Sequence, residues 1–312
     1  MTRRPLILVP LDGSSASNTA LPAARRVAER VGAELCILCV TAQPLPVSQL
    51  VATLGLSEAE IARVRLEQAI GAPGRVIMRV ARERHPWLLV MSTQGESARR
   101  EHRLGSTTAA VIQATTYAIL VVRPDMPEPT RSLRQLMRVL LPLDGSPSAA
   151  AAVLPAAELA RRLGARLDLL HVATLGKPLP KERGSLVGPR YLDAPEHEWP
   201  AWAQEFLERF GPGPEALPAA EVQLHVTHGD PSEAILCFAR EQHSDLIAIA
   251  WHRTLEAGRA EIVKYLLREA SCPLLFVEAA PGRPVQSKRR WFHDSSTDPL
   301  AWQRQRRLPG TR

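Results

Sequence analysis

An internal repeat is the sequence feature that most constrains the fold. Residues 6–40 match residues 138–172 at a constant offset of 132, and the turn Pro10-Leu11-Asp12-Gly13-Ser14 recurs at 142–146. A second pair of segments, 81–83 and 239–241, matches at an offset of 158. The difference of 26 residues indicates an insertion in the second copy, within about 174–221. A repeat that covers most of the chain predicts two domains of one fold.

The length agrees with this division, because 312 residues are enough for two domains of ordinary size. We predict a first domain over 1–123 and a second over 136–280. A linker rich in proline and charge, 123–135, joins them, and residues 281–312 form a basic flexible tail.

Apolar runs alternate with helical patterns in both copies. The first copy predicts strands at 6–9, 35–40, 64–69, 88–91 and 119–122, with helices ending at 31 and covering 74–84 and 106–115. A short helix is expected within 45–60, and another at 199–210 in the insertion. Strands that are apolar on both faces and separated by helices predict an α/β fold, in which helices cover both faces of a parallel sheet.

The charge, the cysteines and the hydropathy exclude several classes of protein. The net charge is +7, but residues 281–312 alone carry +6, so nucleic-acid binding is unlikely except through this tail. No apolar run approaches the length that crosses a bilayer, which predicts a cytoplasmic protein without membrane contact. Cys36 and Cys39 lie in a strand and should point to opposite faces. His225 and His228 have no carboxylate or cysteine at ligand spacing, so we predict no metal site.

A loop with spaced glycines follows the fourth predicted strand of the first copy. It reads Ser92-Thr93-Gln94-Gly95, then nine residues, then Gly105-Ser106-Thr107 at the start of a helix. Ligands of open parallel sheets bind beyond the carboxyl ends of the strands. Glycines let the backbone approach a phosphate closely, and a helix start offers unpaired N–H groups. Without a Walker lysine, the loop predicts polyphosphate binding by backbone and hydroxyl donors.

At these residues the chain resembles the universal stress protein family. The family's ATP-binding pattern is G-x2-G-x9-G-[ST], preceded by an aspartate after the first strand, and Ser92 replaces the first glycine here. The resemblance spans both copies and implies two Rossmann-like (HUP-type) doubly wound domains that bind ATP, with or without Mg²⁺. It places adenine and ribose at the first turn, the base on a valine, and the phosphates on the loop. The implied site residues are Pro10, Leu11, Asp12, Val40, Ser92, Gly95, Gly105, Ser106 and Thr107.

The second copy departs from this pattern. It keeps the turn with Asp144, but Ala260-Glu261 stands where the family has Gly-Ser. A carboxylate at that helix start would repel phosphate, and we expect Trp251 to fill the space of the base or ribose. Asp-Gly-Ser turns also cap helices, so both aspartates have a purely structural alternative. We therefore predict a nucleotide in the first domain only.

The function that follows is a regulatory ATP-binding protein of the stress response with an unknown protein partner, rather than an enzyme, although slow ATP hydrolysis is compatible with it. The alternative is a nucleotide-free protein-interaction scaffold of the same fold. The family resemblance also implies pairing through the last strands, 119–122 and 274–277. In a tandem chain these strands can pair with each other, which predicts an internal pseudo-dimer; a further homodimer remains open.

Overall fold

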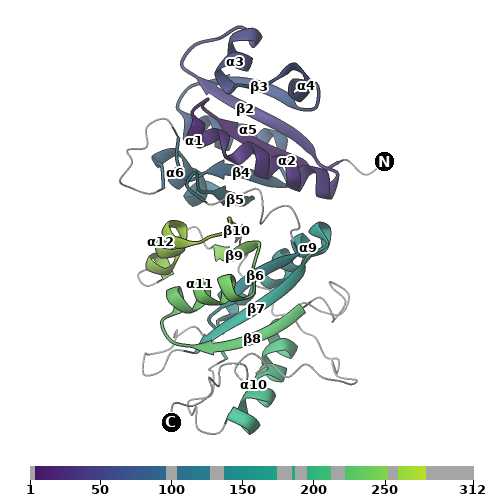
Figure 1. The fold of residues 1–312 in the computed structure, drawn as a ribbon, viewed down its shortest axis with the longest axis vertical. Coiled ribbons are helices and arrows are strands. Elements are labelled where there is room, and N and C mark those ends of the chain that lie inside the picture. Colours follow the sequence, from purple (N-terminus) through teal and green to yellow (C-terminus); the bar gives the residue numbers. More distant parts are fainter. Residues whose placement is uncertain are drawn as a thin grey trace, which may run out of the picture.

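A computed structural model describes residues 4–95, 104–126, 137–173, 185–186, 195–211, 222–251 and 259–278. All ten strands form a single sheet with the order β3-β2-β1-β4-β5-β10-β9-β6-β7-β8. Each half of this order repeats the other in reverse, as expected for two copies of one domain joined at a shared edge. Figure 1 shows the two halves stacked end to end, with β5 and β10 at the junction.

The first half contains β1 to β5 and α1 to α6. Its strands agree in position with the expected ones to within two residues at each end. The strands are β1 (Leu6–Leu11), β2 (Glu34–Thr41), β3 (Arg65–Ile70), β4 (Leu88–Ser92) and β5 (Ala118–Val122). The helices are α1 (Ser15–Asn18), α2 (Ala20–Val31), α3 (Val47–Leu54), α4 (Glu58–Ile61), α5 (Pro73–Arg84) and α6 (Ser106–Ala114).

The second half repeats this order with one large addition, the helix of the insertion. Its strands are β6 (Arg138–Leu143), β7 (Arg166–Ala173), β8 (Val222–His228), β9 (Leu246–Trp251) and β10 (Leu274–Glu278). Its helices are α8 (Pro147–Ala150), α9 (Val153–Leu163), α10 (Pro195–Phe210), α11 (Pro231–Glu241) and α12 (Arg259–Glu269). The added helix, α10, lies beyond β7 and β8 at the far end of the molecule (Figure 1).

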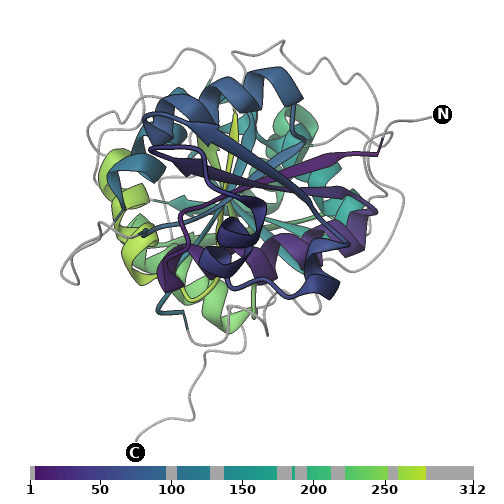
Figure 2. The ribbon, with the colours of Figure 1, turned by 90° about the horizontal axis from the view of Figure 1, so that it is seen from above.

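Within each half all strand pairs are parallel, and helices lie on both sides of the twisted sheet (Figure 2). The central strands are buried on both faces, as their continuous apolar sequences predict. The helices end where the sequence predicts, since Gly32 and Gly164 adopt the left-handed conformation that glycine tolerates after a helix. Among the described helices, none has both the length and the apolar character needed to cross a membrane.

The predicted internal pairing of the two halves is confirmed. Strand β10 runs antiparallel to β5, with Leu275 opposite Leu120 and Phe276 opposite Ile119. Side-chain contacts reinforce the junction on both faces. The Trp251 indole N–H donates to the carbonyl oxygen of Ile112 on α6 at 2.7 Å, and Arg30 Nε donates to the last carbonyl of α9, that of Leu163, at 2.7 Å.

Candidate functional site

The candidate site of the first half lies where the strand order of that half reverses. From β1 the chain moves outward through β2 and β3, and then returns to add β4 and β5 on the other side of β1. Asp12 follows β1, Ser92 ends β4, and Ser106 begins α6, so these residues meet at one edge of the sheet. The crevice at such a reversal is where doubly wound sheets bind ligands.

The turn after β1 is organised by Asp12. Its Oδ1 accepts hydrogen bonds from the Ser14 backbone N–H at 3.0 Å and from the Ser14 hydroxyl at 2.6 Å. Ser14 in turn caps α1 by accepting from the Ser17 N–H at 3.0 Å. Gly13 between them has φ of 84°, a left-handed conformation that favours glycine. The aspartate therefore has a structural task in this turn, whatever else it binds.

Gly95 and Gly105 bring the spaced-glycine loop against this turn. A β-carbon on Gly95 would lie 2.5 Å from Asp12 Oδ2, closer than any side chain tolerates. The Gly105 N–H donates to the Thr93 carbonyl oxygen at 2.6 Å and closes the base of the loop. A β-carbon there would lie 3.3 Å from the same oxygen. Gly95 thus packs directly against the Asp12 carboxylate, and Gly105 packs against the Thr93 carbonyl oxygen at the base of the loop.

Ser92, predicted to lie at the edge of the ribose-phosphate site, ends β4 at the base of the loop. Its side chain is buried, with 5% exposed. Its hydroxyl lies 3.4 Å from the Thr19 hydroxyl and accepts from the Gln94 N–H at 3.3 Å. The Thr108 hydroxyl donates to the Ser92 carbonyl oxygen at 2.8 Å. Ser92 therefore braces the base of the loop from inside.

Three of the predicted residues lie in the strands β1 and β2. Pro10 and Leu11 are buried in β1, so only their backbone can face a ligand. Val40 is half-buried in β2, one residue beyond Cys39, the register partner of Leu11. Val40 therefore stands beside the turn, on the side away from the loop.

The start of α6 completes the geometry. Gly105 is its N-cap and offers no side chain, so no side chain caps the first turn. Ser106 is exposed and Thr107 is half-buried. The first turn of α6 contains no acidic residue, whereas Glu261 lies in the first turn of α12, the equivalent helix of the second half. An uncapped helix start without a carboxylate favours an anion.

The equivalent turn of the second half has the same hydrogen bonds but is covered. Asp144 Oδ1 accepts from the Ser146 N–H at 2.9 Å and from its hydroxyl at 2.5 Å, as in the first half. Asp12 is exposed and Asp144 half-buried, while Ser14 is half-buried and Ser146 completely buried. The Leu186 N–H donates to the Gly145 carbonyl oxygen at 2.9 Å and lays backbone over the turn, in the place that Thr53 of α3 takes beside Gly13 in the first half. A structural task in the turn explains why the second half retains Asp144.

Aromatic side chains of α10 cover the same end of the second half. His171, at the carboxyl end of β7, lies against Trp202 with ring centroids 4.5 Å apart. Trp202 and Phe206 are 5.0 Å apart, and Phe206 is completely buried. We call Trp202 and Phe206 the aromatic cap. The expectation that Trp251 fills this space is wrong: its indole is hydrogen-bonded at the junction with α6, and the insertion supplies the covering side chains instead.

His171 makes the second half sensitive to acid. Burial lowers the pKa of His171 to about 4, against smaller opposing effects of the Leu143 carbonyl and of Asp144. The folded protein therefore keeps this histidine neutral between about pH 4 and pH 6.5, where the unfolded chain binds a proton. We expect the free energy of unfolding to fall as the pH drops through this window, by about 3 kcal/mol from this residue alone. Urea unfolding at several pH values measures the loss.

The His171→Phe variant removes the titrating group and should lose this part of the pH dependence. Trp202→Phe is the matched control, because it changes the neighbouring ring and retains His171. An equal pH dependence in wild type and His171→Phe would show that His171 is not buried in neutral form.

The structure also contains a polar cluster that the sequence analysis missed. His225 Nε2 lies 3.2 Å from Asp168 Oδ1, and Arg166 Nε lies 2.9 Å from the same oxygen. Burial would raise the pKa of Asp168, but the hydrogen bond and charge of His225, together with Arg166, outweigh it and lower the pKa. Asp168 is 57 residues from His225 in sequence, outside the ligand spacing considered above, so local spacing could not indicate this pair. Within the described segments no group of three potential metal ligands occurs.

Comparison with known proteins places both halves in one family. The model of the universal stress protein family matches residues 4–123 and again residues 136–278. A universal stress protein from Archaeoglobus fulgidus DSM 4304 has a similar structure, with 17% identity, a TM-score of 0.57, and coverage of 88% of this chain and 98% of that chain. A functionally unknown protein from Pseudomonas aeruginosa PAO1 has 13% identity, a TM-score of 0.59, and coverage of 88% and 92%. At these identities the structural likeness establishes the fold.

Proposed function

The chain belongs to the universal stress protein family, and from this premise we propose that it is a regulatory ATP-binding protein with one nucleotide site, in its first half. Asp12 and Val40 would hold the ribose and adenine, together with the backbone of Pro10 and Leu11. The phosphates would lie against the loop and the start of α6, at the residues Gly95, Gly105, Ser106 and Thr107, with Ser92 bracing the loop from beneath. Mg²⁺, where it accompanies the nucleotide, would be bound mainly through the phosphates.

One observation carries the proposal, the difference in burial between two turns with the same hydrogen bonds. Asp12 is exposed beside a glycine that leaves no room for a side chain. Its counterpart Asp144 is half-buried, and Ser146 beside it is completely buried. A polyphosphate needs close approach to backbone N–H groups, and only the first half combines an exposed aspartate in the turn, paired glycines and a helix start without a carboxylate.

We propose a regulatory role rather than an enzymatic one. ATP bound at this site would be recognised through backbone and hydroxyl donors, and the motif contains no Walker lysine. Slow hydrolysis remains compatible with such a site. Nucleotide occupancy would then act by changing the surface offered to a protein partner, in the cytoplasm and as part of a stress response.

A nucleotide-free scaffold is the second candidate. The observation that favours it is the aromatic cap, because the chain's own side chains cover the end of the second half that corresponds to the candidate site of the first. In this reading the open turn of the first half is a remnant, and the protein acts only through its surfaces. The two candidates differ in whether purified protein contains ATP.

Mass spectrometry of nucleotide released from protein purified without added nucleotide separates the candidates. We expect ATP close to equimolar with the chain in wild type, and at least about tenfold less in Gly105→Val, because the added side chain would approach the Thr93 carbonyl oxygen. Ala260→Val makes the corresponding change at α12 and should leave the ATP content unchanged. Absence of ATP in wild type, together with no shift of the melting temperature in millimolar ATP and magnesium, would establish the scaffold.

A further inference from the structure

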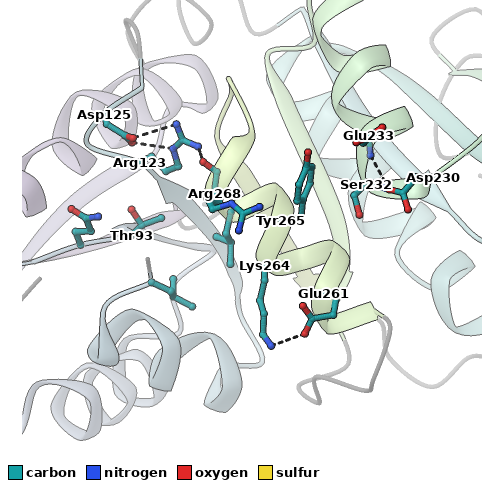
Figure 3. Close-up of a pocket in the computed structure, with 13 residues that line it drawn as sticks. Thr93, Arg123, Asp125, Asp230, Ser232, Glu233, Glu261, Lys264, Tyr265 and Arg268 are labelled. Atoms are coloured by element: carbon teal, nitrogen blue, oxygen red, sulfur yellow. Dashed lines mark hydrogen bonds and ion pairs between the residues drawn. The ribbon is translucent and has the colours of Figure 1, made fainter. Parts of the chain in front are cut away.

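A groove of about 860 Å³ lies at the junction of the two halves, on the face that carries α6 and α12, and its lining residues lie on both sides of α12 (Figure 3). Thr93, Gln94 and Arg123 line it from the first half, and α12 with the start of α11 lines it from the second. Its volume lies in the range of cavities that bury small ligands or several side chains. None of the proposed nucleotide-binding residues lines the groove, but Thr93, Gln94 and Leu104 belong to the phosphate loop, so the groove adjoins the proposed nucleotide site.

The pseudo-twofold symmetry of the molecule indicates what the groove accommodates. Ser92 pairs with Val122 as Ala250 pairs with Val277, so the next residues, Thr93 and Trp251, are equivalent. By the same symmetry Ile112 on α6 corresponds to Leu267 on α12, which lines the groove. On one side of the axis Trp251 fills the niche and donates its indole N–H to Ile112. On the other side the equivalent residues, Thr93 and Leu267, both line the groove, and Thr93 is smaller than the Trp251 it corresponds to and 4% exposed.

The end of the groove nearest the start of α11 is acidic. Asp230 caps α11, accepting from the Ser232 N–H at 3.0 Å, and Glu233 lies in the first turn. Glu261 also lines the groove and pairs with Lys264 at 2.8 Å. Within the described segments no lysine or arginine forms an ion pair with Asp230 or Glu233. These two exposed carboxylates favour a cationic segment at this end of the groove.

Residues 279–312, which follow β10, suit this groove because they are basic, contain aromatic side chains and begin beside it. They carry a net charge of +6 and contain the run Lys288-Arg289-Arg290-Trp291-Phe292. They leave the sheet at Glu278, whose register partner is Trp251, on the edge where α11 and α12 begin. The 13 residues from Glu278 to Trp291 can span about 43 Å. The 11 residues of α12, along which the groove runs, span only about 16 Å, so the segment is long enough to bring Trp291 to the far end of the groove.

We propose that this C-terminal segment docks into the groove of its own chain, with Trp291 in the niche between Thr93 and Leu267. Along the segment, the basic run comes before Trp291. Along the groove, the acidic end with Asp230 and Glu233 lies nearest Glu278, where the segment begins, so basic residues and tryptophan meet the groove in the matching order. The docked segment would lie beside Thr93, Gln94 and Leu104, which flank the proposed phosphate loop. Any effect of docking on nucleotide binding rests on the proposed function, whereas the docking itself does not.

Cross-linking of the full chain without nucleotide tests the docking. The sequence has only four lysines, of which Lys264 lies on the groove and Lys288 in the segment. An amine-reactive cross-linker should join Lys264 to Lys288, detected by mass spectrometry of the digest. A mixture of isotopically light and heavy chains should give this product only within one chain. Products that join light to heavy chains would assign the groove to a second copy, and absence of the Lys264–Lys288 product would overturn the proposal.

Three variants test the stated contacts. Trp291→Ala should reduce the Lys264–Lys288 product at least about fivefold, whereas Trp302→Ala, the matched control, should leave it unchanged. Glu233→Gln should reduce it in a salt-dependent way. Thr93→Trp should close the niche as Trp251 does and abolish the product, with circular dichroism confirming the fold. Equal yields in wild type, Trp291→Ala and Glu233→Gln would contradict docking even if Thr93→Trp failed to fold.

Discussion

Gly95→Ala is expected to lower the affinity for ATP at least about tenfold. The added β-carbon would lie 2.5 Å from Asp12 Oδ2, so either the carboxylate or the loop must move. Asp12 is held by two hydrogen bonds from Ser14, and the loop is closed by the hydrogen bond from Gly105 to Thr93. The substitution therefore disturbs the ribose side and the phosphate side of the proposed site together. Isothermal titration calorimetry with ATP and magnesium measures the loss.

The matched control is Gly74→Ala, in the first turn of α5. A β-carbon there would meet Ala110 at 3.5 Å, an ordinary contact. We expect unchanged ATP affinity and a gain of about 0.5–1 kcal/mol in stability, because alanine restricts the unfolded chain and favours the helix. If Gly95→Ala bound ATP as tightly as Gly74→Ala, the close approach of Gly95 to Asp12 would have no part in nucleotide binding.

Phe206→Ala is expected to destabilise the second half by about 3–5 kcal/mol. Phe206 is completely buried, with Trp202 at 5.0 Å on one side and Phe210 at 5.2 Å on the other. Its removal leaves a cavity in the aromatic cap, above the carboxyl ends of β6 and β7. Urea unfolding followed by fluorescence and circular dichroism should show this loss, with the second half unfolding before the first.

Gln204→Ala provides the control on the same helix, because Gln204 is exposed and contacts only Glu208 among the described residues. Its effect should stay within about 0.5 kcal/mol. Phe206→Ala should also gain no second ATP site, since Glu261 remains at the start of α12. A loss below about 1 kcal/mol would show that α10 does not cover the sheet as described.

The fold was predictable because the repeat and the apolar runs both report on backbone geometry. An apolar run between two helices has few alternatives to a parallel strand, and Gly32 ends its helix where the sequence places it. The pairing of β5 with β10 was predictable for the same reason. Two copies of one domain with equivalent last strands can satisfy both open edges by pairing with each other.

The contents of the second site were less predictable, because they depend on packing between residues far apart in sequence. Trp251 follows a strand at a suitable position, yet its indole turns toward α6, where a helix carbonyl accepts its N–H. The side chains that cover the turn come from an insertion whose helical pattern indicates an amphipathic helix but not the surface it packs on. The pairing of His225 with Asp168 is likewise set by the β7–β8 register and not by local spacing.

The candidate site of the first half was predictable only in part. The glycine spacing predicts close approach of the loop backbone to a phosphate, and this stays a prediction; the structure adds that Gly95 packs against the Asp12 carboxylate and Gly105 against the Thr93 carbonyl oxygen. The inward direction of the Ser92 hydroxyl was not predictable, since it depends on Thr19, 73 residues away. The retained aspartate was ambiguous in the sequence, and the structure explains why. Asp12 and Asp144 make the same turn, so an aspartate at this position does not by itself distinguish a binding site from a scaffold.

The central claim is one nucleotide per chain, bound in the first half, and native mass spectrometry with increasing ATP tests it most directly. The account predicts a single bound ATP per polypeptide at saturation, in wild type and in Phe206→Ala alike, and its disappearance in Gly95→Ala. Two bound nucleotides per chain, or one that persists in Gly95→Ala, would contradict it.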